Sequence, residues 1–141
     1  MHLVLDACVA LDWFLPSAAG ASYSQPLAKT TASGNAWFHV PVHFDVEVCG
    51  QLLKSHRRKP DTFSKKWLDT SLETLDMLPM DTHAIGVNFK LLGDLAAAYG
   101  LTAYDVPYFH LARMLELPMV TRDRGIISAC KAWNVVHWTP G

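Results

Sequence analysis

The chain opens with the stretch HLVLDACVALDWFLP, residues 2–16. The apolar run at its start is typical of a strand in a parallel sheet, because helices cover both faces of such a sheet. Asp6 ends the run, and Asp is depleted within strands, so we expect its carboxylate at the carboxyl end of the strand, where open α/β sheets bind ligands. A carboxylate there would equally cap the helix that follows. The stretch alone leaves both roles open.

Length and composition describe an ordinary globular chain. It has 141 residues, of which 50% are hydrophobic, and a formal net charge of −1, so we expect a single domain over residues 1–141. This balance gives no overall attraction to nucleic acid or membranes. Three cysteines in no metal-ligand spacing indicate free thiols in the reducing cytoplasm. No apolar run approaches the roughly 20 residues of a membrane helix, so we expect no membrane contact.

Strand and helix patterns alternate along the rest of the chain, as judged from apolar spacing and from the positions of Pro and Gly. We expect helices over 9–15, 17–33 with an interruption near Pro26, 42–56, from about 61 onward, 82–99 with a stop at Gly100, 104–115 and 123–133. We expect strands over 36–40, 75–78, 118–121 and 135–137. The alternation predicts an α/β fold with three α/β/α layers and a mainly parallel central sheet.

Four acidic residues follow strands or open helices in this arrangement: Asp6, Glu47, Asp105 and Asp123. The carboxyl ends of parallel strands share one edge, so Asp6 and Asp123 can converge there, while the other two project from the first turns of neighbouring helices. Pro107 supports this placement for Asp105, because proline is tolerated only in the opening turn of a helix. Taken singly, Asp105 and Asp123 would also suit the start of a helix without any chemistry.

Carboxylates gathered in one cleft repel one another, and some of them take up protons at neutral pH. A divalent cation removes the repulsion, and oxygen ligands without His or Cys suit Mg²⁺ or Mn²⁺. Such a cation activates water and neutralises phosphate. Asp45 is two positions from Glu47 and therefore faces elsewhere on the helix, toward water. Asp12 is interpreted as a cap or as part of a solvated face.

In the order in which they occur, these motifs resemble those of PIN-domain ribonucleases, especially the VapC-type toxins of type II toxin–antitoxin pairs. The similar segments are Leu5–Pro16, Val46–Leu52, Gly100–Tyr108 and Val120–Asp123. Cys8 departs from the pattern, because the family usually has Ser or Asn at that position to orient the first carboxylate or a metal-bound water. Val106 and Pro107 also replace a smaller pair after the third acid.

The resemblance implies a PIN-like fold and a metal-dependent endoribonuclease that hydrolyses RNA phosphodiester bonds with activated water. The implied catalytic and metal-binding residues are Asp6, Glu47, Asp105 and Asp123, with Thr121 and Cys8 as supporting residues. The implied cofactor is Mg²⁺ or Mn²⁺. The resemblance also implies a cytoplasmic homodimer that a cognate antitoxin neutralises.

Basic side chains supply candidate contacts to RNA phosphates. Arg122 and Arg124 flank Asp123 and would reach a scissile phosphate or an antitoxin carboxylate. Arg57 and Arg58 end a helix, where they would equally complement its dipole. The seven histidines are scattered with no ligand spacing.

Two other functions can be compared with this sequence. A catalytically weak or inactive PIN domain that binds RNA or a protein is the alternative, and Cys8 is its sequence support. A phosphotransfer enzyme or receiver is disfavoured, because Asp6 lacks a second aspartate two residues later and no adjacent acidic pair opens the first strand. The chain also has no glycine-rich loop for a nucleotide.

Overall fold

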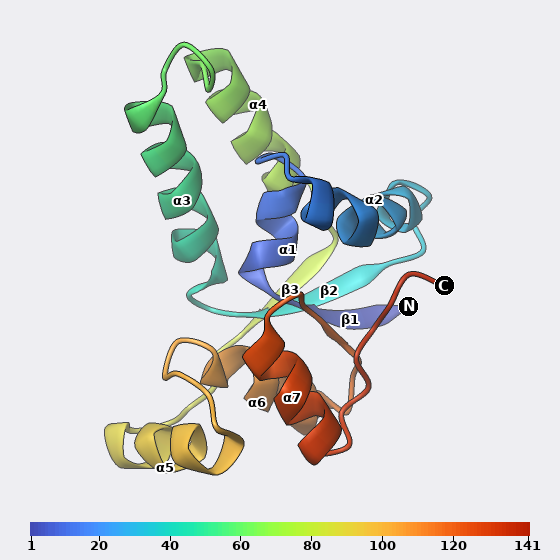
Figure 1. Ribbon diagram of the computed structural model, residues 1–141, viewed down its shortest axis with the longest axis vertical. Helices are drawn as coiled ribbons and strands as arrows, with labels where there is room; N and C mark the ends of the chain where they lie inside the picture. The colour runs from blue at the N-terminus through green and yellow to red at the C-terminus, as the bar shows by residue number, and fades with distance from the viewer.

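The computed structural model describes all of residues 1–141. At its centre is a four-stranded parallel sheet in the order β3-β2-β1-β4 (Figure 1). The strands are β1 (His2–Leu5), β2 (Trp37–Pro41), β3 (Met80–His83) and β4 (Met119–Val120). The opening stretch therefore forms an inner strand, with Val4 opposite His39 on one side and Leu5 opposite Val120 on the other.

Helices cover both faces of the sheet, which confirms the predicted three α/β/α layers (Figure 1). The helices on one face are α1 (Ala7–Asp12), α2 (Ala18–Ala32), α3 (Phe44–Arg58) and α4 (Lys65–Asp76). Those on the other face are α5 (Phe89–Tyr99), α6 (Val106–Leu115) and α7 (Arg124–Ala132). None of them is long and apolar enough to cross a membrane.

One core cluster of 25 buried residues holds the layers together. Leu3, Val4 and Leu5 are all fully buried, which is why the first strand reads as an unbroken apolar run. Helix α6 packs on β1 and β2 through a buried face that includes Tyr108 and Phe109. Burying such side chains contributes about 1.5–3 kcal/mol each, so this packing holds α6 against the sheet.

Two predicted elements are wrong. Leu75 to Leu78 do not form a strand, because they end α4 and the turn after it. The third strand is Met80–His83, which pairs with β2 after Pro79 and shortens the predicted helix over 82–99 to Phe89–Tyr99. As predicted, that helix ends at Gly100, whose φ of 66° favours glycine.

Two smaller expectations also change. The predicted strand over 135–137 is only a single bridge between Met119 and His137. Helix α2 continues through Pro26 rather than being interrupted there. Proline removes one helical hydrogen bond, but Ser22 and Pro26 are exposed, so water can reach the carbonyl that loses its donor. The other boundaries lie close to their predicted positions.

Candidate active site

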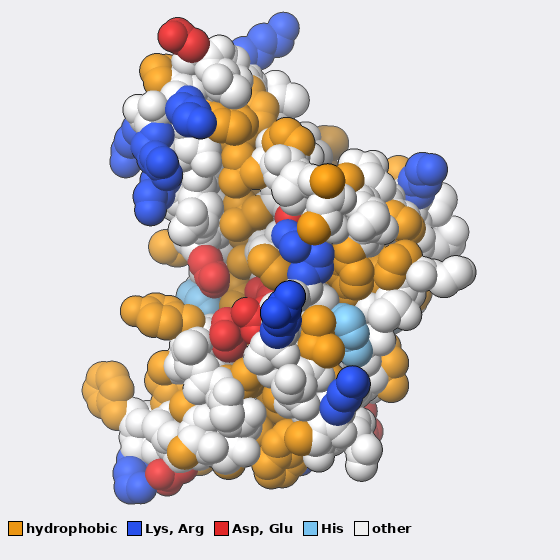
Figure 2. Space-filling model, in the orientation of Figure 1, with side chains coloured by type: hydrophobic (Ala, Val, Ile, Leu, Met, Phe, Trp, Pro, Cys, Tyr) orange, Lys and Arg blue, Asp and Glu red, His pale blue; other side chains and the backbone are white.

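The carboxyl edge of the sheet brings the four predicted acidic residues to one region. Asp6 follows β1, Asp123 follows β4, Asp105 precedes α6, and Glu47 lies in the first turn of α3. Figure 2 shows acidic side chains gathered in a hollow at the middle of one face, with basic side chains directly beside them. This is the convergence that parallel topology predicts.

The side chain of Asp6 does not cap α1. Its Oδ2 accepts a hydrogen bond from Thr121 Oγ1 at 2.6 Å and one from Cys8 Sγ at 3.2 Å. Asp6 is only 6% exposed, and this burial is the main cause that raises its pKa, with further increases from the charges of Asp105 and Glu47. The two hydrogen bonds oppose the shift without cancelling it. Simple capping, one of the two roles left open by the sequence, is therefore wrong for Asp6.

Asp105 lies at the N-cap position of α6, and its side chain makes no capping hydrogen bond. Pro107 occupies the first turn of that helix, as the sequence predicts. Partial burial raises the pKa of Asp105, and repulsion from Asp123 and Glu47 adds to the increase. The charges of Asp105 and Glu47 thus act on Asp6, and those of Asp123 and Glu47 act on Asp105. The four carboxylates are therefore close enough to repel one another.

The side chain of Glu47 is held by aromatic neighbours. Tyr108 donates its hydroxyl to Glu47 Oε2 at 2.7 Å, and His43 Nε2 lies 3.7 Å from the same oxygen. Tyr108 is fully buried in α6, so this bond ties the position of Glu47 to the core. Asp45 is exposed on the same helix, as its spacing predicts.

Asp123 does cap a helix, because its Oδ1 accepts a hydrogen bond from the Ile126 backbone N–H at 2.9 Å. Its own backbone N–H donates to Thr121 Oγ1 at 3.0 Å. The second carboxylate oxygen has no hydrogen-bond partner within the protein. The capping role considered from the sequence is therefore confirmed, and it still leaves one oxygen available.

Thr121 is the buried connection between two of the acids, since its hydroxyl contacts both Asp6 and the backbone of Asp123. The backbone of Thr121 is itself held by two hydrogen bonds to other side chains. The N–H donates to Tyr23 Oη at 3.2 Å, and the carbonyl accepts from His137 Nε2 at 2.8 Å. Tyr23 and His137 carry no signal in the sequence, because each meets Thr121 only once the chain is folded.

Cys8 occupies the position at which the resembling family usually has Ser or Asn. Burial, followed by the charge of Asp6, raises the pKa of its thiol to about 12. The thiol is therefore protonated at neutral pH and supplies the hydrogen bond to Asp6 Oδ2. A hydroxyl would make the same contact with a stronger donor.

The donor set suits a hard divalent cation, because its available atoms are carboxylate oxygens without His or Cys nitrogen or sulfur. No three His, Cys, Asp or Glu side chains lie close enough together to enclose a cation. The carboxylates consequently lie at the same edge of the sheet and repel one another. They would have to move closer together to ligate one ion.

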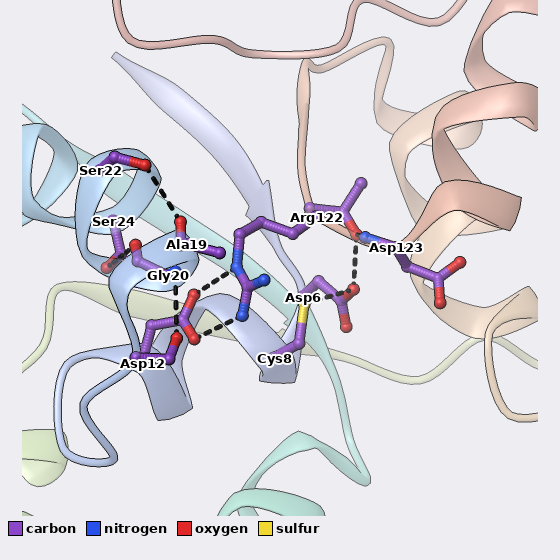
Figure 3. Close-up of polar contacts among 11 residues, drawn as sticks. Asp6, Cys8, Asp12, Ala19, Gly20, Ser22, Ser24, Arg122 and Asp123 are labelled. Atoms are coloured by element: carbon purple, nitrogen blue, oxygen red, sulfur yellow. Dashed lines mark hydrogen bonds and ion pairs between the residues drawn. The ribbon is translucent and has the colours of Figure 1, made fainter.

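The basic candidates differ in their surroundings. Arg124 is exposed at the start of α7, and Arg57 and Arg58 are exposed in the last turn of α3. Arg122 instead makes two hydrogen bonds to Asp12, from Nε to Oδ2 at 2.7 Å and from Nη2 to Oδ1 at 2.6 Å (Figure 3). The interpretation of Asp12 as a cap or solvated charge is wrong, because its side chain is only 6% exposed.

Three histidines that are far apart in the sequence meet on adjacent strands. His2 Nδ1 lies 2.9 Å from His39 Nε2, and His39 Nδ1 lies 2.9 Å from His83 Nε2. These histidines are scattered in the sequence with no ligand spacing, and it is the fold that brings them together. Each nitrogen in these contacts faces a neighbouring ring, so the three imidazoles form a hydrogen-bonded row rather than a chelate.

The sequence of this chain is similar to that of a known ribonuclease. Ribonuclease VapC3, found in two strains of Mycobacterium tuberculosis, is 27% identical over 136 residues, which make up 96% of this chain and 90% of that protein. No family model matches the chain. The resemblance to VapC-type PIN-domain ribonucleases is confirmed.

Two solved structures share the fold. The first is PAE2754 from Pyrobaculum aerophilum, with a TM-score of 0.62 and 16% identity over 92% of this chain and 84% of that one. The second is VapBC2 from Rickettsia felis bound to a DNA fragment from their promoter, with a TM-score of 0.64 and 14% identity over 98% of both chains. At such low identity the likeness concerns the fold.

Proposed function

We propose that this chain is an endoribonuclease toxin that hydrolyses RNA phosphodiester bonds with the help of Mg²⁺ or Mn²⁺. The observation that carries the proposal is the gathering of Asp6, Glu47, Asp105 and Asp123 at one sheet edge, where burial and mutual repulsion raise the pKa of Asp6 and Asp105. A fold keeps such uncompensated carboxylates at a cost in stability, which a bound cation would remove. The similarity to ribonuclease VapC3 supports RNA as the substrate.

The four acids would hold the cation, which when bound would activate water and neutralise the scissile phosphate. Thr121 and Cys8 orient Asp6 by donating hydrogen bonds to one of its oxygens. Tyr108 orients Glu47 in the same way. Because all these donors are buried or partly buried, the carboxylates would be positioned before substrate arrives.

The exposed guanidinium groups would guide RNA to this edge. Arg124 follows Asp123 directly, and Arg57 and Arg58 lie at the far end of α3. Exposed cations attract the RNA backbone regardless of its sequence. They therefore fit a general role in binding, and selection of a cleavage sequence would lie elsewhere.

We further propose a cognate antitoxin that silences the enzyme, a homodimer, and a cytoplasmic location. The likeness to the VapBC2 structure supports the antitoxin. The three unpaired cysteines are compatible with a reducing compartment.

The test is cleavage of a mixed pool of structured RNAs with Mg²⁺ or Mn²⁺, compared with EDTA. Asp6→Asn and Asp105→Asn should each lower the cleavage rate by at least about a hundredfold. Asp45→Asn is the matched control, since Asp45 is exposed and contacts none of the other acids; it should cleave like the wild type. Folded, antitoxin-free protein that cuts nothing in the pool would overturn the proposal.

The second candidate function is an inactive PIN domain that binds RNA or a protein. Two observations favour it: Cys8 is a weaker donor than a hydroxyl, and the carboxylates do not yet enclose a cation. Cys8→Ser separates the two functions. It should raise the cleavage rate of an enzyme and leave an inactive module inactive.

A further inference from the structure

The most unexpected contact near the acidic edge is the ion pair between Asp12 and Arg122. The two residues are 110 positions apart, and they join the end of α1 to the loop between β4 and α7. Figure 3 shows the Arg122 side chain reaching past Asp6 and Cys8 to the Asp12 carboxylate. Both carboxylate oxygens accept hydrogen bonds, at 2.7 and 2.6 Å, so the guanidinium group is fixed in its plane.

The fold makes room for this pair. A Cβ atom added to Gly20 would lie 2.5 Å from the carboxyl carbon of Asp12 and 2.7 Å from Ser17 Oγ. Only a residue without a side chain therefore lets the start of α2 approach the Asp12 carboxylate this closely. Ser17 completes the turn by accepting a hydrogen bond from the Gly20 backbone N–H at 3.0 Å.

The pair is buried on one side and open on the other. The Asp12 side chain is 6% exposed, whereas that of Arg122 is 32% exposed. Arginine has five N–H donors, and Asp12 occupies one on Nε and one on Nη2. The Nη1 donors make no hydrogen bond within the protein.

Arg122 lies beside two acids of the proposed site, Asp6 and Asp123 (Figure 3). It follows Thr121 directly and precedes Asp123. Its hydrogen bonds to Asp12 direct the guanidinium group away from both acids (Figure 3). Asp12 thus keeps Arg122 beside the acidic edge and away from its carboxylates.

We propose that Asp12 is a positioning residue that holds Arg122 as a phosphate-binding residue for RNA at the acidic edge. The inference rests on the proposed ribonuclease function and deepens it. A planar guanidinium group with free donors suits a phosphate oxygen, and a fixed cation offsets the repulsion between RNA and the carboxylates. An arginine that only joined α1 to the loop before α7 would not need free donors on an exposed side.

The first test measures binding of a labelled single-stranded oligouridylate in EDTA, over a range of salt concentrations. Each phosphate contact on single-stranded RNA contributes about 0.7 to the slope of log affinity against log salt. Arg122→Gln should lower the slope by about this amount. Lys131→Gln removes the same charge from an exposed site at the far end of α7 and should leave the slope unchanged. An unchanged slope for Arg122→Gln would overturn the inference.

The second test addresses Asp12. Asp12→Asn retains Arg122 but releases it, so kcat/KM for RNA cleavage should fall by about tenfold. In an Arg122→Gln background the same substitution should cause no further loss. If Asp12→Asn and Arg122→Gln lower the melting temperature but leave the salt slope and the kcat/KM of the folded protein at wild-type values, the pair is only a staple and the inference is wrong.

The outcomes separate this inference from the proposed function. Metal-dependent cleavage with an unchanged Arg122→Gln slope would retain the ribonuclease and reject the phosphate contact. A lowered slope without any cleavage would retain the contact and reject the ribonuclease. If Arg122→Gln loses binding to an acidic peptide but not to RNA, Arg122 serves a protein partner, and the inference is overturned.

Discussion

Helix α1 carries an aspartate at each end, Asp6 before its first turn and Asp12 in its last residue. The whole Asp6 residue is 6% exposed, and the side chain of Asp12 is likewise 6% exposed. Asp12 is paired with a guanidinium group through two hydrogen bonds. Asp6 receives only hydrogen bonds from a hydroxyl and a thiol, and the charges of Asp105 and Glu47 act on it.

Burying a carboxylate is costly unless a cation or strong donors compensate for it. At Asp12 the protein supplies the cation itself, so this carboxylate is already compensated. At Asp6 the compensation is incomplete, and the pKa of the carboxyl is raised by burial and by its acidic neighbours. The difference indicates that the Asp6 carboxylate is prepared for a cation from outside the chain, whereas the Asp12 carboxylate needs none.

The largest effect on stability is expected from removing the Asp12 carboxylate. Asp12→Ala leaves the Arg122 guanidinium group without its partner, and we expect the free energy of unfolding to fall by about 2 kcal/mol, below the cost for a fully buried pair because water can reach Arg122. Urea unfolding measures the change. Asp69→Ala removes the exposed Lys65–Asp69 pair and should change the free energy by less than about 0.5 kcal/mol. Equal losses would mean that burial gives the Asp12 pair no special role.

Gly20→Ala tests the space around Asp12. Alanine normally stabilises a helix by about 1 kcal/mol relative to glycine. The added Cβ would lie 2.5 Å from the Asp12 carboxyl group, so we expect a net loss of about 1 kcal/mol instead. Gly93 lies inside α5 with no atom close to an added Cβ. Gly93→Ala should therefore raise the melting temperature while Gly20→Ala lowers it, and a rise in both would contradict the close approach.

The parts of the fold and site that could be predicted from the sequence are those with a local sequence pattern. The buried strand β1, the stop at Gly100 and the first-turn placement of Pro107 follow from the chemistry of neighbouring residues. Asp6 could be placed at the sheet edge because parallel topology brings strand ends together. The same rule gave the positions of Asp105 and Asp123.

Other features depend on contacts that no local pattern reveals. The pairing of Asp12 with Arg122 links residues 110 positions apart, and nothing near Asp12 marks it as buried. Strand β3 was missed because it is an edge strand with Asp81 and His83 among its residues, whereas the apolar Leu75–Leu78 segment has the composition of a strand. The row of His2, His39 and His83 likewise exists only once three strands align.

The smallest expected effect is a pH-dependent gain in stability when the Asp6 carboxylate is removed. The folded-state pKa of Asp6 is raised, so the folded protein binds this proton more tightly than the unfolded chain does. The resulting stability is present at low pH and is lost as the pH rises through the folded-state pKa. Asp6→Asn removes that loss, and its amide oxygen can still accept from Thr121 and Cys8. We expect a melting temperature about 2 °C above that of the wild type at pH 7.5, and no difference near pH 4.

Mg²⁺ should offset the same uncompensated charge of the Asp6 carboxylate. At pH 7.5 it should raise the melting temperature of the wild type and leave that of Asp6→Asn nearly unchanged, because the variant lacks the carboxylate that the cation would neutralise. Asp61→Asn, at an exposed acid without a hydrogen-bond partner, should respond to Mg²⁺ like the wild type. If Asp6→Asn is less stable than the wild type at pH 7.5, the Asp6 carboxylate is a structural acceptor, and the contrast between the two ends of α1 disappears.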